Sequence, residues 1–333
     1  MSRKLITIST IMTLMSTSVI ADVPNVAADI APIHSLVSRV MDGVGAPKLI
    51  VQSGASPHGY RLRPSEAKAL QDADHVFWMG EELTPWLDSA IGTLASKASV
   101  TTLLDQQGVI LHDFREGALF EAHDHSAHGD DDHDDHDDHD DHDDHKDHDD
   151  HDDHDDHKDH DDHDDHDPHA WLSPENAKLW LNIIASKLSV SDPENAATYF
   201  MNAAAGQAEI EAMIAEVKAT LKPVQGGKFV VFHDAYQYFE NDFDFYASGA
   251  ISLGDSSDPS PARIEKVQKR IRDEGIQCVL AEPQFKKGLV ATVMEGSDAT
   301  ASVIDPLGAE LETGPKLYTR LIKNMAKTLR NCL

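Results

Sequence analysis

Residues 193–232 read PENAATYFMNAAAGQAEIEAMIAEVKATLKPVQGGKFVVF, and this stretch decides the fold. No strong helix breaker occurs in residues 193–221, although Gly206 weakens the middle. The stretch therefore predicts one helix of 29 residues, about 43 Å long. A Lys-Pro pair and a Gly-Gly turn end this helix, and residues 228–232 (KFVVF) then predict a buried strand. A helix of this length can connect two lobes as one stiff element.

Short apolar runs, each bounded by turn or helix signals, lie on both sides of this helix. Before it, residues 48–51 (KLIV) and 75–79 (HVFWM) predict strands, with a helix opening at Pro64-Ser65-Glu66 between them. Behind it, the pattern predicts strands at 277–281 (QCVLA) and 301–304 (ASVI) and helices at 262–273 and 316–330. Strands that alternate with helices favour an α/β fold with largely parallel sheets.

The chain is long enough for two such units. Without a leader of 21 residues and an insert of 45, 267 of the 333 residues remain, and single cores stop growing at about 250–300 residues. We therefore expect two (β/α) lobes, each with a mainly parallel sheet, joined by one long rigid helix. The expected parts are a signal peptide (1–21), an N-terminal lobe (22–172) with a disordered loop (123–167), a helical region with the linking helix (173–222) and a C-terminal lobe (223–333).

The N-terminus has the pattern of a cleavable secretory signal. Arg3 and Lys4 precede a run at residues 5–20 that is apolar but broken by Ser and Thr, and Ala21 ends a small-residue cleavage site. The run is too short and too rich in hydroxyl groups for a membrane-spanning helix. Because neither cysteine lies near the cleavage site, a lipid anchor is not expected. The sequence predicts a freely soluble, exported protein.

Most of the negative charge belongs to one insert. The chain has 28 Lys+Arg and 59 Asp+Glu, a net charge of −31, but residues 123–167 alone hold 25 Asp, 2 Lys and 15 His. The rest of the chain therefore carries only −8. Such acidity argues against a nucleic-acid binder, which needs a basic face. Because the insert has almost no apolar residues, we expect it to be disordered.

The insert predicts loose metal binding. From His133 to His166 a histidine falls at every third position, mostly as Asp-Asp-His. Neutral imidazole suits Zn, Cu and Ni, and the carboxylates add ionic attraction. The alternative is a solvating acidic linker, for which Asp and Glu without His would serve. A flexible tract pays an ordering entropy on binding, so we expect several weak sites in it and the specific site elsewhere.

A specific site must come from the six histidines outside the insert. His58, His169 and His233 each lie at a loop position, and two of them follow predicted strands. Ligands of open α/β sheets bind beyond the carboxyl ends of strands, so these side chains can converge from two lobes. Asp305 follows the strand at 301–304 and can add an oxygen, and three imidazoles with one carboxylate suit Zn²⁺. For each histidine alone, an exposed or capping role is the alternative.

Spacing leaves the roles of several residues open. His169 continues the three-residue register of the insert, but the apolar residues 170–172 indicate that ordered structure begins there. His75 is expected in a strand, as a core or sheet-edge residue. His112 precedes the insert and is a candidate for its loose chelation, and His34 is a candidate auxiliary ligand.

The two cysteines, Cys278 and Cys332, are expected in an oxidising compartment, where an even pair suggests one disulfide. Closing a loop of 54 residues would add about 4 kcal/mol of stability in the chain-entropy model. The alternative is two free thiols.

Four spaced motifs carry a resemblance to a known family. They are GASPHGY with RPS at 54–65, DPHAWLSP at 167–174, FHDAY at 232–236 and DPLG at 305–308. They resemble the metal-binding solute-binding proteins of ABC transporters, in particular the periplasmic high-affinity zinc-uptake type with a His-rich loop. The likeness spans essentially the whole chain after the leader.

The resemblance implies a zinc site made of His58, His169 and His233. Asp305 matches the acidic fourth position of the family. Some zinc members use a water there, or a Glu before the first His, and here that neighbour is Pro57. Manganese members carry Glu where His233 stands, and a third imidazole favours zinc over manganese. The C-terminal disulfide of the family agrees with the cysteine pair.

The expected protein is therefore a periplasmic, monomeric carrier and not an enzyme. It would capture Zn²⁺ between two lobes and deliver it to a membrane permease that works with a cytoplasmic ATPase. The main alternative is a zinc hydrolase with the same three histidines, for which Asp234 or Glu282 would be the general base. A third class is an extracytoplasmic metal-buffering or adhesive protein.

Overall fold

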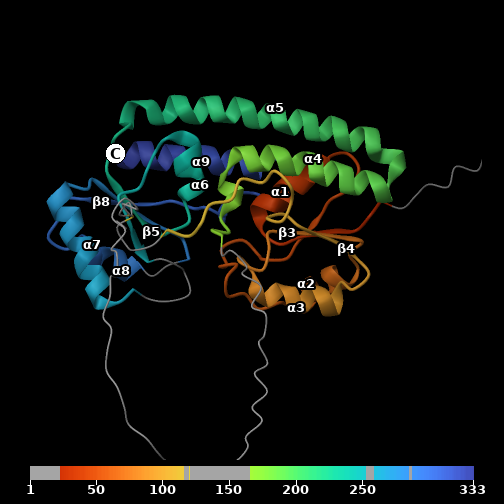
Figure 1. The fold of residues 1–333 in the computed structure, drawn as a ribbon, viewed down its shortest axis with the longest axis horizontal. Helices are drawn as coiled ribbons and strands as arrows, with labels where there is room; N and C mark the ends of the chain where they lie inside the picture. The colour runs from red at the N-terminus through yellow and green to blue at the C-terminus, as the bar shows by residue number, and fades with distance from the viewer. Residues whose placement is uncertain (1–22, 116–119, 121–165, 253–258, 285–286) are drawn as a thin grey trace, which may run out of the picture.

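The computed structural model describes residues 23–115, 120, 166–252, 259–284 and 287–333. Within these residues the strands form two separate four-stranded sheets, and every pairing of strands is parallel. Figure 1 shows the two sheets side by side beneath a shared layer of helices. The α/β class with two parallel sheets, predicted from the alternating pattern, is confirmed.

The N-terminal sheet has the strand order β2-β1-β3-β4. Its strands are β1 (Val26–Ala28), β2 (Lys48–Leu49), β3 (His75–Trp78) and β4 (Ser99–Thr102). One face packs against α2 (Pro64–Gln71) and α3 (Pro85–Leu94), and α1 (Ala31–Val40) belongs to the opposite face. Both faces are therefore covered, which is the usual requirement of a parallel sheet.

The C-terminal sheet repeats this plan with the order β6-β5-β7-β8. Its strands are β5 (Phe229–His233), β6 (Ala250–Ser252), β7 (Cys278–Ala281) and β8 (Thr300–Val303). Its helices are α6 (Gln237–Phe243), α7 (Pro261–Glu274), α8 (Lys287–Met294) and α9 (Leu317–Cys332). A core cluster on one face includes residues of α7 and α8, and α6 and α9 belong to the cluster on the other face.

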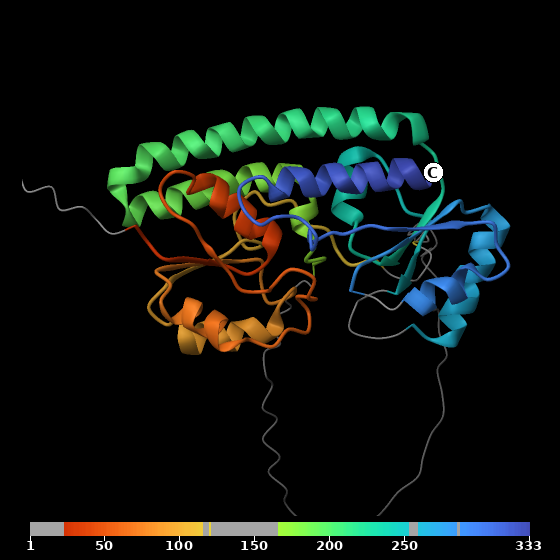
Figure 2. The same cartoon turned by 180° about the vertical axis from the view of Figure 1, so that it is seen from behind.

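The predicted long helix is α5 (Ala196–Leu221), with 26 residues and a length of about 39 Å. It starts three residues later than expected because residues 193–195 form a 3-10 turn, in which the Asp192 side chain accepts from the Asn195 backbone N–H. Figures 1 and 2 show α5 running above both sheets, with α4 (Pro174–Ser191) and α9 between it and the sheets. Ser173 caps α4, because the Ser173 side chain accepts from the Asn176 N–H.

Gly206 weakens the helix locally but permits close packing of α5 on its neighbours. A Cβ at this position would lie 2.9 Å from Leu181 of α4 and 3.1 Å from Arg39 of α1. One core cluster continues from the N-terminal sheet through α4, α5 and α9 to the C-terminal sheet. The connection is therefore broader than one helix, and this shared core restricts motion of one sheet against the other.

The two cysteines form a disulfide. Cys278, the first residue of β7, is bonded to Cys332, the last residue of α9, across a sequence separation of 54. This bond fastens the C-terminal helix to the centre of the C-terminal sheet. The interpretation of the pair as one disulfide is confirmed.

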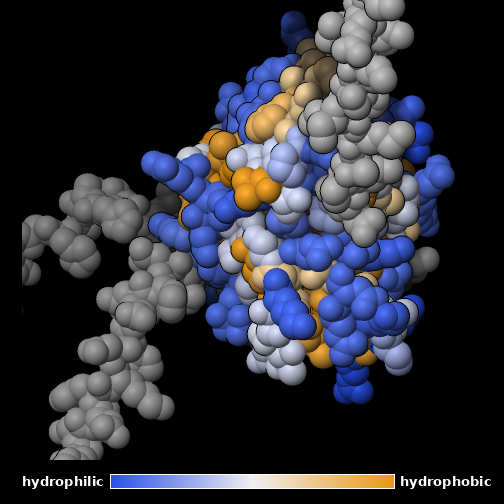
Figure 3. Space-filling model, turned by 90° about the vertical axis from the view of Figure 1, so that its right-hand side faces the viewer, coloured by the Kyte–Doolittle hydropathy of each residue, from blue (hydrophilic) through white to orange (hydrophobic). Residues whose placement is uncertain are grey.

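The predicted signal peptide and nearly all of the insert lie outside the described residues. The insert boundary at residue 167 is wrong, however, because His166 pairs with Asp113 in an antiparallel bridge and Asp167 is buried. Among the described helices, none combines the length and the apolar character needed to cross a membrane. Figure 3 shows the end of the molecule at the α4–α5 turn, where apolar areas alternate with hydrophilic ones.

Candidate metal centre

His58 lies on the loop between β2 and α2, beyond the carboxyl end of the N-terminal sheet. The Trp86 indole N–H donates to the Pro57 carbonyl at 2.6 Å, and the Tyr60 hydroxyl donates to Glu66 at 2.8 Å. Glu66 is buried at the start of α2 and also accepts from the Arg63 backbone N–H. These bonds fix the loop on both sides of His58, which is half-buried.

His169 is buried just before the 3-10 turn at residues 170–172, which leads into α4. Its Nδ1 lies 2.6 Å from a carboxylate oxygen of Asp167, and that same oxygen accepts from the His169 backbone N–H. Asp167 is 1% exposed. This carboxylate orients the ring and, by accepting the Nδ1 proton, leaves Nε2 with a free lone pair.

His233 is the last residue of β5. The strand therefore ends one residue later than the sequence predicts, and His233 lies at its end and not in the loop that follows. Its Nδ1 lies 2.6 Å from Glu282, which directly follows β7, the neighbouring strand. Glu282 is 2% exposed and also accepts from Gln284. His233 therefore has the same support as His169, a buried carboxylate on Nδ1 and Nε2 directed elsewhere.

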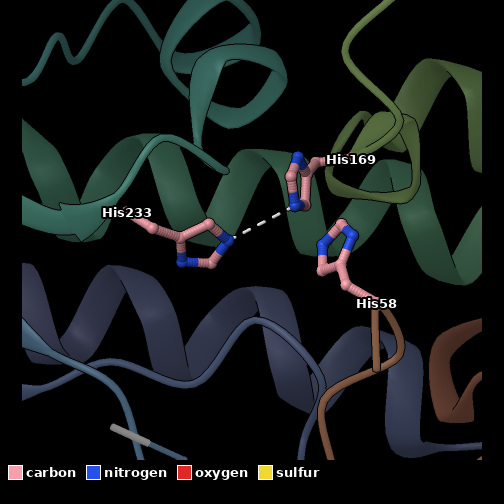
Figure 4. Close-up of side chains that lie close together, drawn as sticks. All are labelled: His58, His169 and His233. Carbon is pink, nitrogen blue, oxygen red and sulfur yellow. Dashed lines mark hydrogen bonds between the residues drawn. The ribbon is translucent and has the colours of Figure 1, made fainter. Parts of the chain in front are cut away.

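The three histidines converge on one point, as Figure 4 shows. One nitrogen atom from each of His58, His169 and His233 lies within 4.8 Å of the other two, and within the described residues they form the one such group of potential metal ligands. The Nε2 atoms of His169 and His233 are 3.3 Å apart. Two nitrogens at about 2.0–2.1 Å from a tetrahedral Zn²⁺ would be separated by about 3.3 Å.

The electrostatics of this pair favour a cation. If both Nδ1 protons are donated to carboxylates, the two Nε2 atoms face each other with their lone pairs. Such an arrangement is repulsive unless a positive charge lies between the nitrogens. A metal ion there would be bound by neutral imidazoles, with two buried carboxylates behind them.

Asp305 stands outside this group. Its carboxylate accepts three backbone N–H bonds, from Leu307 at 3.0 Å, Gly308 at 2.9 Å and Ala309 at 2.5 Å. The structure therefore brings together three of the four predicted ligands. The assignment of Asp305 as the fourth ligand stays a prediction.

The other described histidines outside the insert are accounted for by packing. His34 is buried, with Nε2 at 3.1 Å from the Pro47 carbonyl, and burial lowers its pKa. His75 is buried in β3, as expected for a core residue, and lies 2.7 Å from Ser191. The His112 ring lies beside that of Tyr238, at a centroid distance of 4.7 Å and tilted by 44°. None of these rings joins the three-histidine group.

Three supporting residues were missed or misassigned in the sequence. Asp167 was placed in the disordered insert, although the Asp-Pro-His spacing sets a carboxylate two residues before His169. The sequence pattern suggests Glu282 as a base and not as a support for His233, yet Glu282 follows a strand in the same way as Asp305. Arg115 carried no signal, and it forms ion pairs with the buried Asp234 and Glu240.

The fold and the site together define a class: a two-sheet α/β protein with three converging histidines that could hold a metal ion. Comparison with known families agrees, because residues 26–332 match the family model described as the zinc-uptake complex component A, periplasmic (ZnuA). The chain belongs to this family.

Curated relatives match over almost the full chain. The high-affinity zinc uptake system protein ZnuA of Brucella abortus is 50% identical over 308 residues, covering 92% of this chain and 91% of the relative. The protein of the same name in Paracoccus denitrificans is 46% identical, covering 94% and 93%. Among solved structures, a crystal structure of ZnuA has a TM-score of 0.69 at 20% identity, covering 93% of this chain and 99% of that one. At that identity the structural likeness supports the fold alone.

Proposed function

We propose that this protein captures Zn²⁺ in the periplasm with His58, His169 and His233 and delivers it to the permease of a zinc ABC transporter, which a cytoplasmic ATPase drives. The observation that carries the proposal is the pair of carboxylate-backed imidazoles with Nε2 atoms 3.3 Å apart, joined by a third imidazole. Membership of the zinc-uptake family supports the same cargo. Three borderline nitrogen donors favour Zn²⁺ over the harder Mn²⁺.

Asp305 is the proposed fourth ligand. A carboxylate has about four lone-pair positions, and three of them already accept backbone N–H bonds. One position on Oδ2 is left for a metal ion. Coordination requires Asp305 to approach the three histidines when zinc binds, and water takes this position if it does not.

The hydrolase alternative is not supported. Both acids considered as general bases are already engaged, because Asp234 is ion-paired with Arg115 and Glu282 holds the His233 ring. The matching family is a transport component. We therefore treat the metal ion as cargo and not as a catalytic group.

Release of the cargo requires help from the membrane partner. The continuous core around α5 restricts separation of the two sheets, so a bound ion leaves readily only if docking favours a conformation with lower zinc affinity. The insert would act as a local zinc buffer, because its many imidazole groups would offer several weak binding sites for Zn²⁺.

Zinc titration against a competing chelator tests the proposal. The chain without residues 123–165, which keeps Asp167, should bind one tight Zn²⁺, and His58→Ala, His169→Ala and His233→Ala should each abolish tight binding. His34→Ala is the matched control, because it removes a buried histidine outside the group and should leave the affinity unchanged. Tight binding that survives all three ligand substitutions would contradict the proposal.

A growth assay separates transport from buffering or adhesion. A strain that lacks this gene should fail to grow when a chelator limits zinc, and zinc supplementation should restore growth. The wild-type gene should complement this defect, and the His233→Ala variant should not. Equal growth of the two complemented strains would favour a buffering or adhesive role.

A further inference from the structure

One segment crosses from the helix layer of the N-terminal sheet to the C-terminal sheet beside the metal centre. We call residues 110–115 the crossing arm; it is the gold trace between the two sheets in Figure 1. The arm begins at α4, where the Asn176 amide both accepts from the Ile110 N–H at 2.8 Å and donates to its carbonyl at 2.9 Å. This paired contact fixes one end of the arm.

The middle of the crossing arm holds the residue that orients His169. The His112 carbonyl accepts from the Asp167 backbone N–H at 2.8 Å. The Tyr238 hydroxyl accepts from the His112 N–H at 3.1 Å and donates to the Asp167 carbonyl at 2.7 Å. Asp167 is therefore held through both of its backbone polar groups, one of them bonded to the arm and the other to α6.

The end of the crossing arm is attached beside His233. The Arg115 guanidinium forms ion pairs with Asp234, the residue after His233, and with Glu240 of α6. Its Nε lies 3.0 Å from both oxygens of Asp234, and its Nη1 lies 2.6 Å from Glu240. The Phe120 ring packs over the guanidinium at 3.6 Å.

These ion pairs are buried. The side chains of Arg115, Asp234 and Glu240 are 16%, 7% and 1% exposed. The Arg115 charge compensates both carboxylates, which are withdrawn from water. Removal of the arginine would leave two carboxyl groups without their cation in a desolvated place, which is far more disruptive than the loss of a surface ion pair.

The crossing arm is connected to each of the two buried histidines, His169 and His233, through a different aspartate. Asp167 connects the arm to His169, and Asp234 connects it to the backbone of His233. Arg115 reaches the strand end that carries His233, and it does so with the rigid, forked geometry of a guanidinium.

We propose that Arg115 is a positioning residue for the metal centre: through Asp234, and through the crossing arm to Asp167, it fixes the spacing of the His169 and His233 rings and so slows the loss of bound zinc. The inference rests on the proposed function, because it assumes that these rings bind the cargo. It adds a residue that contacts no ligand atom and attaches the root of the insert to the C-terminal side of the site.

The test is the rate at which Zn²⁺ leaves the tight site of the full chain after an excess of a chelating dye is added. Arg115→Met should raise this rate by about 10–100-fold, the usual effect of changing a group that orients a ligand. Arg115→Lys keeps the positive charge but loses the bidentate guanidinium. Compared with Arg115→Met, it should restore the melting temperature more completely than it restores slow zinc release. A wild-type rate in Arg115→Met would overturn the proposal.

A matched control is available in Arg39, whose side chain is 14% exposed and pairs with Glu209 of α5, away from the metal centre. Arg39→Met should lower the melting temperature without changing zinc release. If it accelerates release as much as Arg115→Met does, the effect is general destabilisation and the proposal fails. If Arg115→Met does not fold, Arg115→Met combined with Asp234→Asn and Glu240→Gln removes the unpaired charges and should still release zinc faster.

Two further comparisons isolate the cause. The ratio of release rates between Arg115→Met and the unsubstituted chain should persist after removal of residues 123–165, and a ratio that disappears would mean that Arg115 acts only through the insert. Absence of a tight site in the unsubstituted chain would refute the proposed function itself. The positioning role is refuted separately, by a tight site whose release is insensitive to Arg115.

Discussion

Replacing Glu282 by Gln should weaken zinc binding although Glu282 is not a ligand. The substitution keeps the shape of the side chain and an acceptor for His233 Nδ1, which lies 2.6 Å away, but removes the negative charge. A carboxylate about 6.5 Å from a bound Zn²⁺ attracts it by about 5 kcal/mol at an effective dielectric constant of about 20, before desolvation is counted. Both side chains are almost fully buried, so little of this attraction is screened by water.

The measured effect should be smaller than this Coulomb energy. The neutral amide still orients the ring, and the carboxylate pays for its own burial in the free protein. Changes to groups that support a metal ligand usually cost about 10–100-fold in affinity, or about 1.4–2.8 kcal/mol. We expect Glu282→Gln to fall in this range.

The assay is a competition titration with a zinc chelator at neutral pH, on the chain without residues 123–165. Asp192→Asn is the matched control, because Asp192 is also fully buried but accepts from Tyr199 and Asn195 at the start of α5. The control should lose stability and keep its zinc affinity. An unchanged dissociation constant for Glu282→Gln would refute the role assigned to the carboxylate behind His233.

Three further predictions concern the fourth ligand, the disulfide and a buried acid. Asp305→Asn should lower zinc affinity about 10-fold or more in the same titration, and an unchanged value would contradict a ligand role for the Asp305 carboxylate. Serine at both Cys278 and Cys332 should reduce the free energy of unfolding by about 2–4 kcal/mol in denaturant titrations and leave zinc affinity intact, because the bond lies at the end of β7 opposite to Glu282. Burial raises the pKa of Asp29 to about 7, so its contribution to stability is complete below about pH 4 and is lost as the pH rises through 7. Relative to Asp29→Asn, the wild-type free energy of unfolding should fall by up to about 4 kcal/mol between pH 4 and pH 8, and a rise would contradict the assignment.

The convergence of the three histidines could be predicted because it follows from the topology of the two parallel sheets. His233 ends a strand of one parallel sheet, and His58 follows a strand of the other. Ligands of such sheets bind beyond the carboxyl ends of the strands. The prediction needed only strand positions and residue types. The same reasoning applies to Glu282, which follows β7, because a carboxylate at this edge of the sheet can support a histidine as well as act as a base.

Contacts that depend on packing could not be predicted in this way. Asp167 belongs by composition to the acidic insert, although it also begins the motif at 167–174, and its bonds to His112 and Tyr238 appear only in the folded chain. Arg115 is one of many charged residues until the fold brings Asp234 and Glu240 to it. Gly206 has a low helix propensity, so the sequence alone gives no reason for it in α5. The reason is the close contact with Leu181, which leaves no room for a Cβ atom at this position.

The contact between Asp167 and the His169 ring determines how the insert is best removed. A deletion of residues 123–167 would remove the carboxylate that orients His169 together with the acidic repeat. A deletion of residues 123–165 removes the repeat alone. The shorter deletion is therefore expected to keep full affinity at the tight site, whereas the longer one loses about 10-fold or more.

The most direct measurement is a crystal structure of the chain without residues 123–165, soaked with or grown in Zn²⁺ and recorded at the zinc absorption edge. We predict one strong anomalous peak at about 2.0–2.1 Å from a ring nitrogen of each of His58, His169 and His233, with the carboxylates of Asp167 and Glu282 on the far side of two rings. A zinc ion bound elsewhere while these three rings stay unligated would contradict the account.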